Sequence, residues 1–166
     1  MGPSEIRRAD PADLPAIVAA LGQKGYFTDR LTRQARGHGL LLIAWKGTEV
    51  VGDVYLWLGP AEEPELRALL PDVPLLTHLE VAPGRRDHGV GTHLLRTAEG
   101  WLHAAGHRRV ALGVSLDNHA AQRLYARLGY TEWPHGELAT TTTVYHPDGK
   151  RERRPDFCLV MVKDLG

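Results

Sequence analysis

One short segment of the sequence combines the residue types needed to hold a phosphate group. Residues 79–95 begin as an apolar run, pass through a turn that contains Gly89 and Gly91, and continue with helical spacing of apolar residues. Glycine lets the backbone approach a ligand without a Cβ clash, and the free N–H groups at a helix start bind anions. Arg85 and Arg86 add positive charge beside this turn. The segment therefore predicts a pyrophosphate site built mainly from main-chain N–H groups.

Two common nucleotide-binding patterns do not fit this segment. The P-loop needs Gly-Lys-Ser/Thr, and no such triplet follows Gly89 or Gly91. The dinucleotide-binding pattern needs a third glycine where Leu94 stands. A tight strand-to-helix turn without any ligand remains as the structural alternative.

A second segment, residues 117–130, carries polar groups on an expected helix. Asn118 stands at the helix start, where a polar side chain either caps the helix or contacts a ligand. Tyr125 lies about two helical turns further along the same face. Taken alone, each residue also has a structural explanation, as a cap and as a packed aromatic ring.

Together, the two segments resemble the GNAT superfamily of acyl-CoA-dependent N-acetyltransferases. Its pyrophosphate signature, Arg/Gln-x-x-Gly-x-Gly/Ala, is matched by Arg86-Asp87-His88-Gly89-Val90-Gly91. Its downstream signature, Asn-x-x-Ala-x-x-Leu-Tyr-x-x-x-Gly-Phe/Tyr, is matched by Asn118, Ala121, Leu124, Tyr125, Gly129 and Tyr130. The clear resemblance covers residues 75–133.

The resemblance implies the fold and the cosubstrate. The fold class is α/β (mixed α+β): a mixed, mostly antiparallel sheet flanked by helices, with a V-shaped opening between two central strands. One such domain is expected over residues 1–166. Acetyl-CoA would be the acetyl donor, and the reaction would be direct attack by a primary amine in a ternary complex.

The resemblance also implies roles for individual residues. The backbone of Leu79, Glu80 and Val81 would pair with the pantetheine arm, and Asn118 would hydrogen-bond nearby. Tyr125 would protonate the departing thiolate as general acid. The pyrophosphate would be held by Arg86 and by backbone N–H groups of Asp87, His88, Gly89, Val90, Gly91 and Thr92. Asp87 departs from the glycine that many members have there, and its side chain is expected to face solvent.

The general base is a separate question. Glu80 and His78 stand two apart on one face of an expected strand, with Thr77 on the other. We expect Glu80 to be the base, with His78 second, and a structural role for either stays open. Members that acetylate ribosomal-protein N-termini often have a glutamate where this chain has Gly113, which argues against that subclass.

Other reactive groups are not expected to take part. His103 and His107 are four apart, but Gly106 should end their helix and nothing completes a zinc set, so no metal is expected. Cys158 is expected in the last strand, away from both motifs, and is not expected to carry an acyl group.

The acceptor amine is harder to read from the sequence. The loop over residues 59–74 carries four acids that would either attract a cationic amine or, as we prefer, belong to a solvated loop: Glu62, Glu63, Glu65 and Asp72. Tyr26, Trp57 and Trp133 would either line a pocket or pack. A small-molecule amine is the first expectation. A protein or peptide amine and a non-catalytic acetyl-CoA sensor are the alternatives, and whether the chain forms a homodimer is left open.

Composition limits the partners. Among the 166 residues, 20 basic side chains balance 20 acidic ones, and nucleic-acid binders usually carry a basic excess. The basic run at residues 150–154 is expected at a solvated hairpin tip. No apolar stretch is long enough for a membrane helix or a signal peptide, so neither nucleic acid nor membrane is an expected partner. With a single cysteine, a cytoplasmic protein is the expectation.

Hydrophobic spacing and turn residues predict the elements. Strands are expected at residues 5–8, 40–45, 50–58, 75–81, 110–114, 140–145 and 157–162. Helices are expected from 11 to 21, 26 to 36, 91 to 105 and 118 to 128, with a short one at 66–70.

Overall fold

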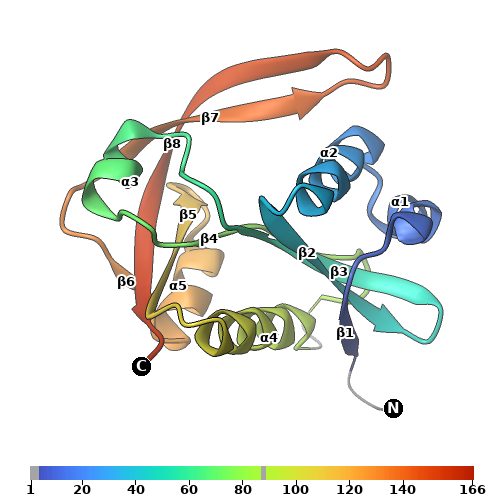
Figure 1. The fold of residues 1–166 in the computed structure, drawn as a ribbon, viewed down its shortest axis with the longest axis horizontal. Coiled ribbons are helices and arrows are strands. Elements are labelled where there is room, and N and C mark those ends of the chain that lie inside the picture. The colour runs from blue at the N-terminus through green and yellow to red at the C-terminus, as the bar shows by residue number, and fades with distance from the viewer. Residues whose placement is uncertain (1–3, 87–88) are drawn as a thin grey trace.

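The computed structural model describes residues 4–86 and 89–166 and contains one mixed sheet with helices on both faces (Figure 1). The strands are β1 (Glu5–Arg8), β2 (Gly39–Lys46), β3 (Glu49–Trp57), β4 (Leu75–Val81), β5 (Arg109–Ser115), β6 (Thr131–Glu132), β7 (Leu138–Tyr145) and β8 (Arg151–Asp164). The helices are α1 (Leu14–Leu21), α2 (Lys24–Ala35), α3 (Pro64–Leu69), α4 (Val90–Ala104) and α5 (His119–Arg127), with a 3₁₀ turn at Pro11–Asp13.

The sheet order is β1-β2-β3-β4-β5-β8-β6, with β7 paired to β8. Every pairing is antiparallel except that of β4 with β5, which is parallel. The expected mixed, mostly antiparallel sheet is therefore confirmed. Among the described residues, no helix is long and apolar enough to cross a membrane.

Alternating apolar residues give the sheet two buried faces. In β2, Leu40, Leu42 and Ala44 pack with α4 residues such as Leu94, whereas Leu41 and Ile43 pack with α1 and α2. Figure 1 shows α4 and α5 on one face of the sheet and α1 and α2 on the other. The strand period of two thus separates two layers, and each layer can carry a different part of a site.

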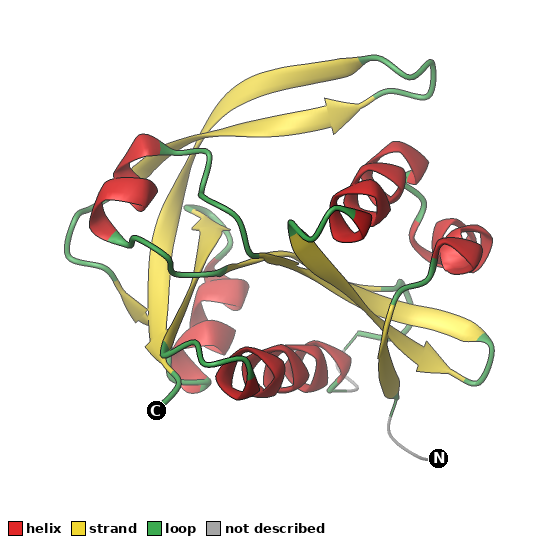
Figure 2. Ribbon diagram, in the orientation of Figure 1, coloured by secondary structure: helices red, strands yellow, loops and turns green. Residues whose placement is uncertain are grey.

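The C-terminal hairpin differs most from the sequence expectation. Strand β8 runs over Arg151–Asp164 instead of residues 157–162, and the two-residue strand β6 was not expected. The basic run was expected at the hairpin tip, but the turn lies at residues 146–150, and Arg151, Arg153 and Arg154 are exposed within β8. The cause is pairing with β7, which extends a polar segment that has little apolar alternation of its own. Figure 2 shows this long hairpin in yellow, reaching away from the sheet.

A substitution at Gly52 on β3 tests how tightly α4 and β4 pack on this strand. A Cβ at Gly52 would lie 2.8 Å from the Glu80 carbonyl oxygen and 3.1 Å from side-chain carbons of Val90 and Leu94. We expect Gly52→Ala to lower the free energy of unfolding by about 1–3 kcal/mol, since buried backbone must move. Urea unfolding followed by circular dichroism measures this.

Gly100 on α4 is the matched control, because a Cβ there meets open space. Gly100→Ala should raise the free energy of unfolding by about 0.5–1 kcal/mol through helix propensity. A Gly52→Ala protein as stable as the parent would contradict the packing described here.

Candidate active site

The turn before α4 has the geometry of an anion site. Gly89 is the N-cap of α4 with φ +79°, and among the described residues no side chain caps the helix. The first N–H groups of the helix have no acceptor within the helix, so they are available to an anion. Gly91 faces β4, where a Cβ would meet Val81 and Leu79 at 3.7 and 3.9 Å. The turn therefore sits closely against the strand that precedes it.

The other residues expected at this turn are placed as follows. Arg86 is exposed beside the turn, and Thr92 is half-buried in the first turn of α4. Arg85 forms an ion pair with Glu49 at 2.7 Å, so its positive charge is partly neutralised within the protein. Asp87 and His88 lie outside the described residues.

Strands β4 and β5 separate after a short paired region. Their only register pairs in the described chain are Leu75 with Ala111 and Leu76 with Leu112. On its β5 side, β4 therefore leaves the backbone of Leu79, Glu80 and Val81 unpaired by a strand. Unpaired backbone N–H and C=O groups need partners, and an extended ligand arm can supply them.

Helix α5 carries the downstream motif on the α4 side of the sheet. The Asn118 side chain caps α5 by accepting from Ala121 N at 3.1 Å. Tyr125 is half-buried, with its ring 5.9 Å from that of Tyr130. Burial raises the pKa of Tyr125, so the phenol keeps its proton at neutral pH.

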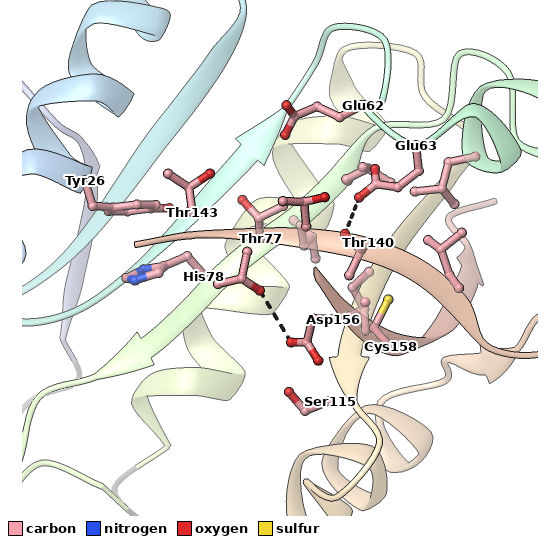
Figure 3. A pocket seen from close by; sticks show the side chains of 18 of the residues that line it. Tyr26, Glu62, Glu63, Thr77, His78, Ser115, Thr140, Thr143, Asp156 and Cys158 are labelled. Carbon is pink, nitrogen blue, oxygen red and sulfur yellow. Dashed lines mark hydrogen bonds between the residues drawn. The ribbon is translucent and has the colours of Figure 1, made fainter. Parts of the chain in front are cut away.

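A cavity of about 650 Å³ lies beside the opening between β4 and β5 (Figure 3). Its walls come from β4, β5, β7, β8, α2 and the loop leading into α3. The lining includes His78 and Tyr26 together with Arg30, Glu62, Glu63, Leu75, Leu76, Thr77, Leu112, Ser115, Leu138, Thr140, Thr142, Tyr145, Asp156 and Cys158. Of the described residues, neither Asn118 nor Tyr125 belongs to this lining.

Strand β7 closes one side of the cavity and is held at both ends. The Thr140 hydroxyl donates to a Glu63 carboxylate oxygen beside α3. Near α2, the Tyr145 ring meets that of Tyr26 edge-on at 6.1 Å between centroids. On this side the cavity is therefore bounded by β7, α2 and the segment before α3, which lie far apart in sequence.

A buried carboxylate holds His78 at one end of the cavity. Asp53 on β3 is fully buried, and its Oδ2 lies 3.1 Å from His78 Nδ1. His78 Nε2 lies 2.9 Å from Gln23 Oε1 and 3.4 Å from Glu80 Oε2. Gln23 Nε2 donates to Glu80 at 2.9 Å. Both expected base candidates thus belong to one hydrogen-bonded cluster with Asp53 and Gln23.

A β-bulge creates this arrangement. Asp53 pairs with Glu80 and Tyr55 pairs with Thr77, so β4 has one more residue than β3 between these pairs. His78 has φ +56°, the left-handed conformation that a bulge accommodates. Thr77 was expected on the face opposite His78, but both line the cavity because the bulge breaks the alternation.

The cluster has unusual electrostatics. Burial raises the pKa of Asp53 to about 6 despite the opposing hydrogen bond and charge of His78. Burial by itself would lower the pKa of His78, but the hydrogen bond and charge of Asp53, together with the charge of Glu80, outweigh it and raise that pKa. Both ring nitrogens of His78 face acceptor oxygens, which suits the protonated ring. Asp53 thus contributes most to the raised proton affinity of His78, and Glu80 adds to it.

Aromatic rings position His78 from α2. The Tyr26 ring stacks on the His78 ring at 4.0 Å between centroids, and Phe27 meets it edge-on at 5.8 Å. The Arg30 guanidinium lies 4.5 Å from the Tyr26 ring centroid and is paired with Asp29. The imidazole is held on one side by a carboxylate and on another by a stacked ring.

The remaining sequence expectations divide in two. The cavity is lined by Tyr26, Glu62 and Glu63, which is one of the two alternatives given for them from the sequence. In contrast, Trp57 and Trp133 do not belong to the described lining: Trp57 lies beside Arg33, and Trp133 packs in a separate core. Glu65 is exposed on α3.

Sequence reasoning missed Asp53 and Gln23. A signal for Asp53 was present, because it is the one charged residue between Val50 and Trp57 in a strand that is otherwise apolar or small. A buried charge in such a strand requires a partner. Gln23 gave no signal, since it lies in the junction between α1 and α2.

Asp53, His78 and Glu80 also form a group whose ligand atoms lie within 4.8 Å of one another, as a metal site would need. In the described structure both ring nitrogens of His78 already have hydrogen-bond partners. The expectation that the chain uses no metal stays a prediction.

Comparisons with known proteins agree with this geometry. The sequence model of the Acetyltransferase (GNAT) family matches residues 8–130. Fold and match together define an acyltransferase. The chain belongs to the GNAT family of acetyltransferases. A search of curated protein sequences finds no significant match.

Solved structures share the fold at low identity. The ribosomal-protein-alanine N-acetyltransferase from Brucella melitensis is 23% identical over 96% of this chain and 99% of its own, with a TM-score of 0.69. A GNAT family acetyltransferase from Elizabethkingia anophelis with acetyl-CoA bound is 15% identical, with 99% of each chain covered and a TM-score of 0.63. The PaiA N-acetyltransferase from Thermoplasma acidophilum in complex with coenzyme A is 16% identical over 99% of each chain, with a TM-score of 0.66.

The coupling between Asp53 and His78 can be measured directly. Asp53→Asn removes the charge that raises the pKa of His78 but leaves its burial, so that pKa should fall. Titration of the imidazole by NMR in the parent and in Asp53→Asn measures this change, and thermal unfolding checks that the variant is folded. An unchanged His78 titration in a folded variant would show that the two side chains do not interact.

Proposed function

We propose that this GNAT enzyme transfers an acetyl group from acetyl-CoA to the primary amine of a small molecule, by direct attack in a ternary complex. The observation that carries the proposal is the Asp53–His78 pair, which lies at the wall of a cavity beside the opening of β4 and β5. A base is needed there because an amine arrives mostly as ammonium and must lose a proton before attack.

The chain offers groups that fit acetyl-CoA. The uncapped start of α4 suits the pyrophosphate, with Arg86 beside it. The unpaired backbone of Leu79, Glu80 and Val81 suits the pantetheine amides. Asn118 uses its side-chain oxygen as a cap, which leaves its amide nitrogen for the arm. When bound, acetyl-CoA supplies the activated acetyl thioester.

His78 is the proposed general base. It lines the cavity, whereas Glu80 is outside the described lining and already accepts from Gln23. Asp53 holds Nδ1, so the amine proton would pass to Nε2 of the neutral ring, in place of the contact of Nε2 with Gln23 Oε1. This reverses the order expected from sequence, and Glu80 remains the second candidate.

Tyr125 is the proposed general acid. Its raised pKa keeps the phenol protonated, as an acid must be before it acts. In the proposed transfer step, the amine nitrogen bonds to the acetyl carbon and the carbon–sulfur bond of the thioester breaks. His78 takes a proton from nitrogen, and Tyr125 gives one to sulfur.

Cavity size supports a small acceptor. About 650 Å³ is within the usual range of roughly 300–1,000 Å³ for small-molecule sites. Strand β7, tied to Glu63 and packed near Tyr26, forms one wall of this cavity. The ribosomal-protein enzyme from Brucella melitensis keeps a protein amine as the second candidate acceptor.

Thiol release from acetyl-CoA with a panel of amines and peptides tests the proposal. At neutral pH, His78→Ala should slow turnover by about 10²- to 10⁴-fold, because the positioned base is lost. The same variant should retain thermal stabilisation by CoA, whose proposed contacts lie at α4 and on the β4 backbone. Tyr125→Phe should likewise slow turnover while sparing affinity for acetyl-CoA.

Other outcomes separate the alternatives. Binding of CoA without turnover of any amine would indicate an acetyl-CoA sensor. Turnover confined to peptides would replace the small-molecule acceptor with a protein one. Full activity of His78→Ala would remove its role as base.

A further inference from the structure

The end of the cavity away from Tyr26 carries two carboxylates with no cationic partner (Figure 3). Glu63 accepts from the Thr140 hydroxyl, and Asp156 accepts from Thr142 at 3.4 Å and from the Phe157 N–H at 2.8 Å. Among the described residues, no Lys, Arg or His lies within ion-pair distance of either carboxylate. Neither carboxylate is therefore neutralised by an ion pair in the described part of the chain, and both line the cavity.

These two carboxylates share one environment. Burial raises the pKa of the Cys158 thiol to about 11, and the charges of Glu63 and Asp156 add to this effect. Cys158 lines the cavity between them, and Figure 3 shows all three at the side opposite Tyr26 and His78. Glu63 is half-buried and Asp156 is exposed. Glu62 differs from both, because it pairs with Arg153 at 3.5 Å.

Beyond its charged groups, the cavity lining carries aliphatic side chains as well as threonine and serine hydroxyls. The aliphatic ones come from five elements: Leu66, Leu75, Leu76, Leu112, Leu138 and Val160. Aliphatic surface favours contact with methylene groups. These side chains suit the carbon chain of a linear molecule.

The end near His78 is walled by Tyr26, whose ring stacks on the imidazole at 4.0 Å between centroids. Arg30 on the same helix is paired with Asp29. An amine at this end would therefore lie beside an aromatic ring and an imidazole.

We propose that the acceptor is a linear aliphatic diamine or polyamine. One amine reacts near His78 and Tyr26, the methylene chain lies on the aliphatic lining, and a second ammonium group binds between Glu63 and Asp156. This rests on the proposed acetyl transfer and names its substrate class. It assigns Glu63 and Asp156 as specificity residues that do not touch the reacting atoms.

A matched pair of amines tests the assignment. We expect kcat/KM for 1,6-diaminohexane to exceed that for hexylamine by about tenfold or more, since a charge-assisted contact is worth about that factor. The double variant Glu63→Gln/Asp156→Asn should lose this preference by raising KM for the diamine, while kcat and the hexylamine KM stay near the parent values. The control variant Glu65→Gln changes an exposed acid on α3 and should keep the preference.

Calorimetric binding of the same two amines separates this inference from the proposed function. Selective diamine binding that the double variant abolishes would support the subsite even if no acetyl transfer occurred. Equal use of both amines, an unchanged preference in the double variant, or a stronger preference for a peptide N-terminus would overturn the inference and leave acetyl transfer standing.

Discussion

The extra residue in β4 opposite β3 determines where the chemistry of this protein can occur. Without it, strand alternation would place Thr77 and His78 on opposite faces of the sheet. With it, His78 adopts φ +56°, and its ring meets the buried carboxylate of Asp53. Leu79 then packs with the core on the α4 side, where a Cβ at Gly91 would lie 3.9 Å from it. The bulge thus turns His78 toward the cavity and Leu79 toward α4.

The two sides perform different tasks in the proposed reaction. The α4 side provides backbone N–H groups and the proposed acid, Tyr125. The other side provides the cavity, with the proposed base at one end and two carboxylates at the other. In the part of the chain that the structure describes, β4 and β5 pair only at Leu75 and Leu76, so the backbone of β4 beyond them is left unpaired on this side. The proposed reaction places the acyl group along this unpaired backbone, where it meets an amine held in the cavity.

Sequence patterns predicted the parts of the site that are local in the chain. Gly89 and Gly91 sit at a strand-to-helix turn, and Asn118 caps α5, because glycine backbone freedom and capping act within a few residues. The Asp53–His78 pair joins two strands through a bulge, and the shift in register that creates it has no local pattern. The long β8 was missed for a related reason, since β7 extends it through backbone pairing and not through its own apolar residues.

The pH dependence of kcat/KM tests the central claim, that His78 acts as a base tuned by Asp53. With one amine acceptor used for both proteins, the parent should gain activity as pH rises through a pKa above the usual value of about 6.5 for histidine. In Asp53→Asn that rise should move to lower pH, because the raised pKa of His78 depends on the carboxylate. A rise that stays in place in Asp53→Asn but is lost in Glu80→Gln would contradict the claim and assign the base to Glu80.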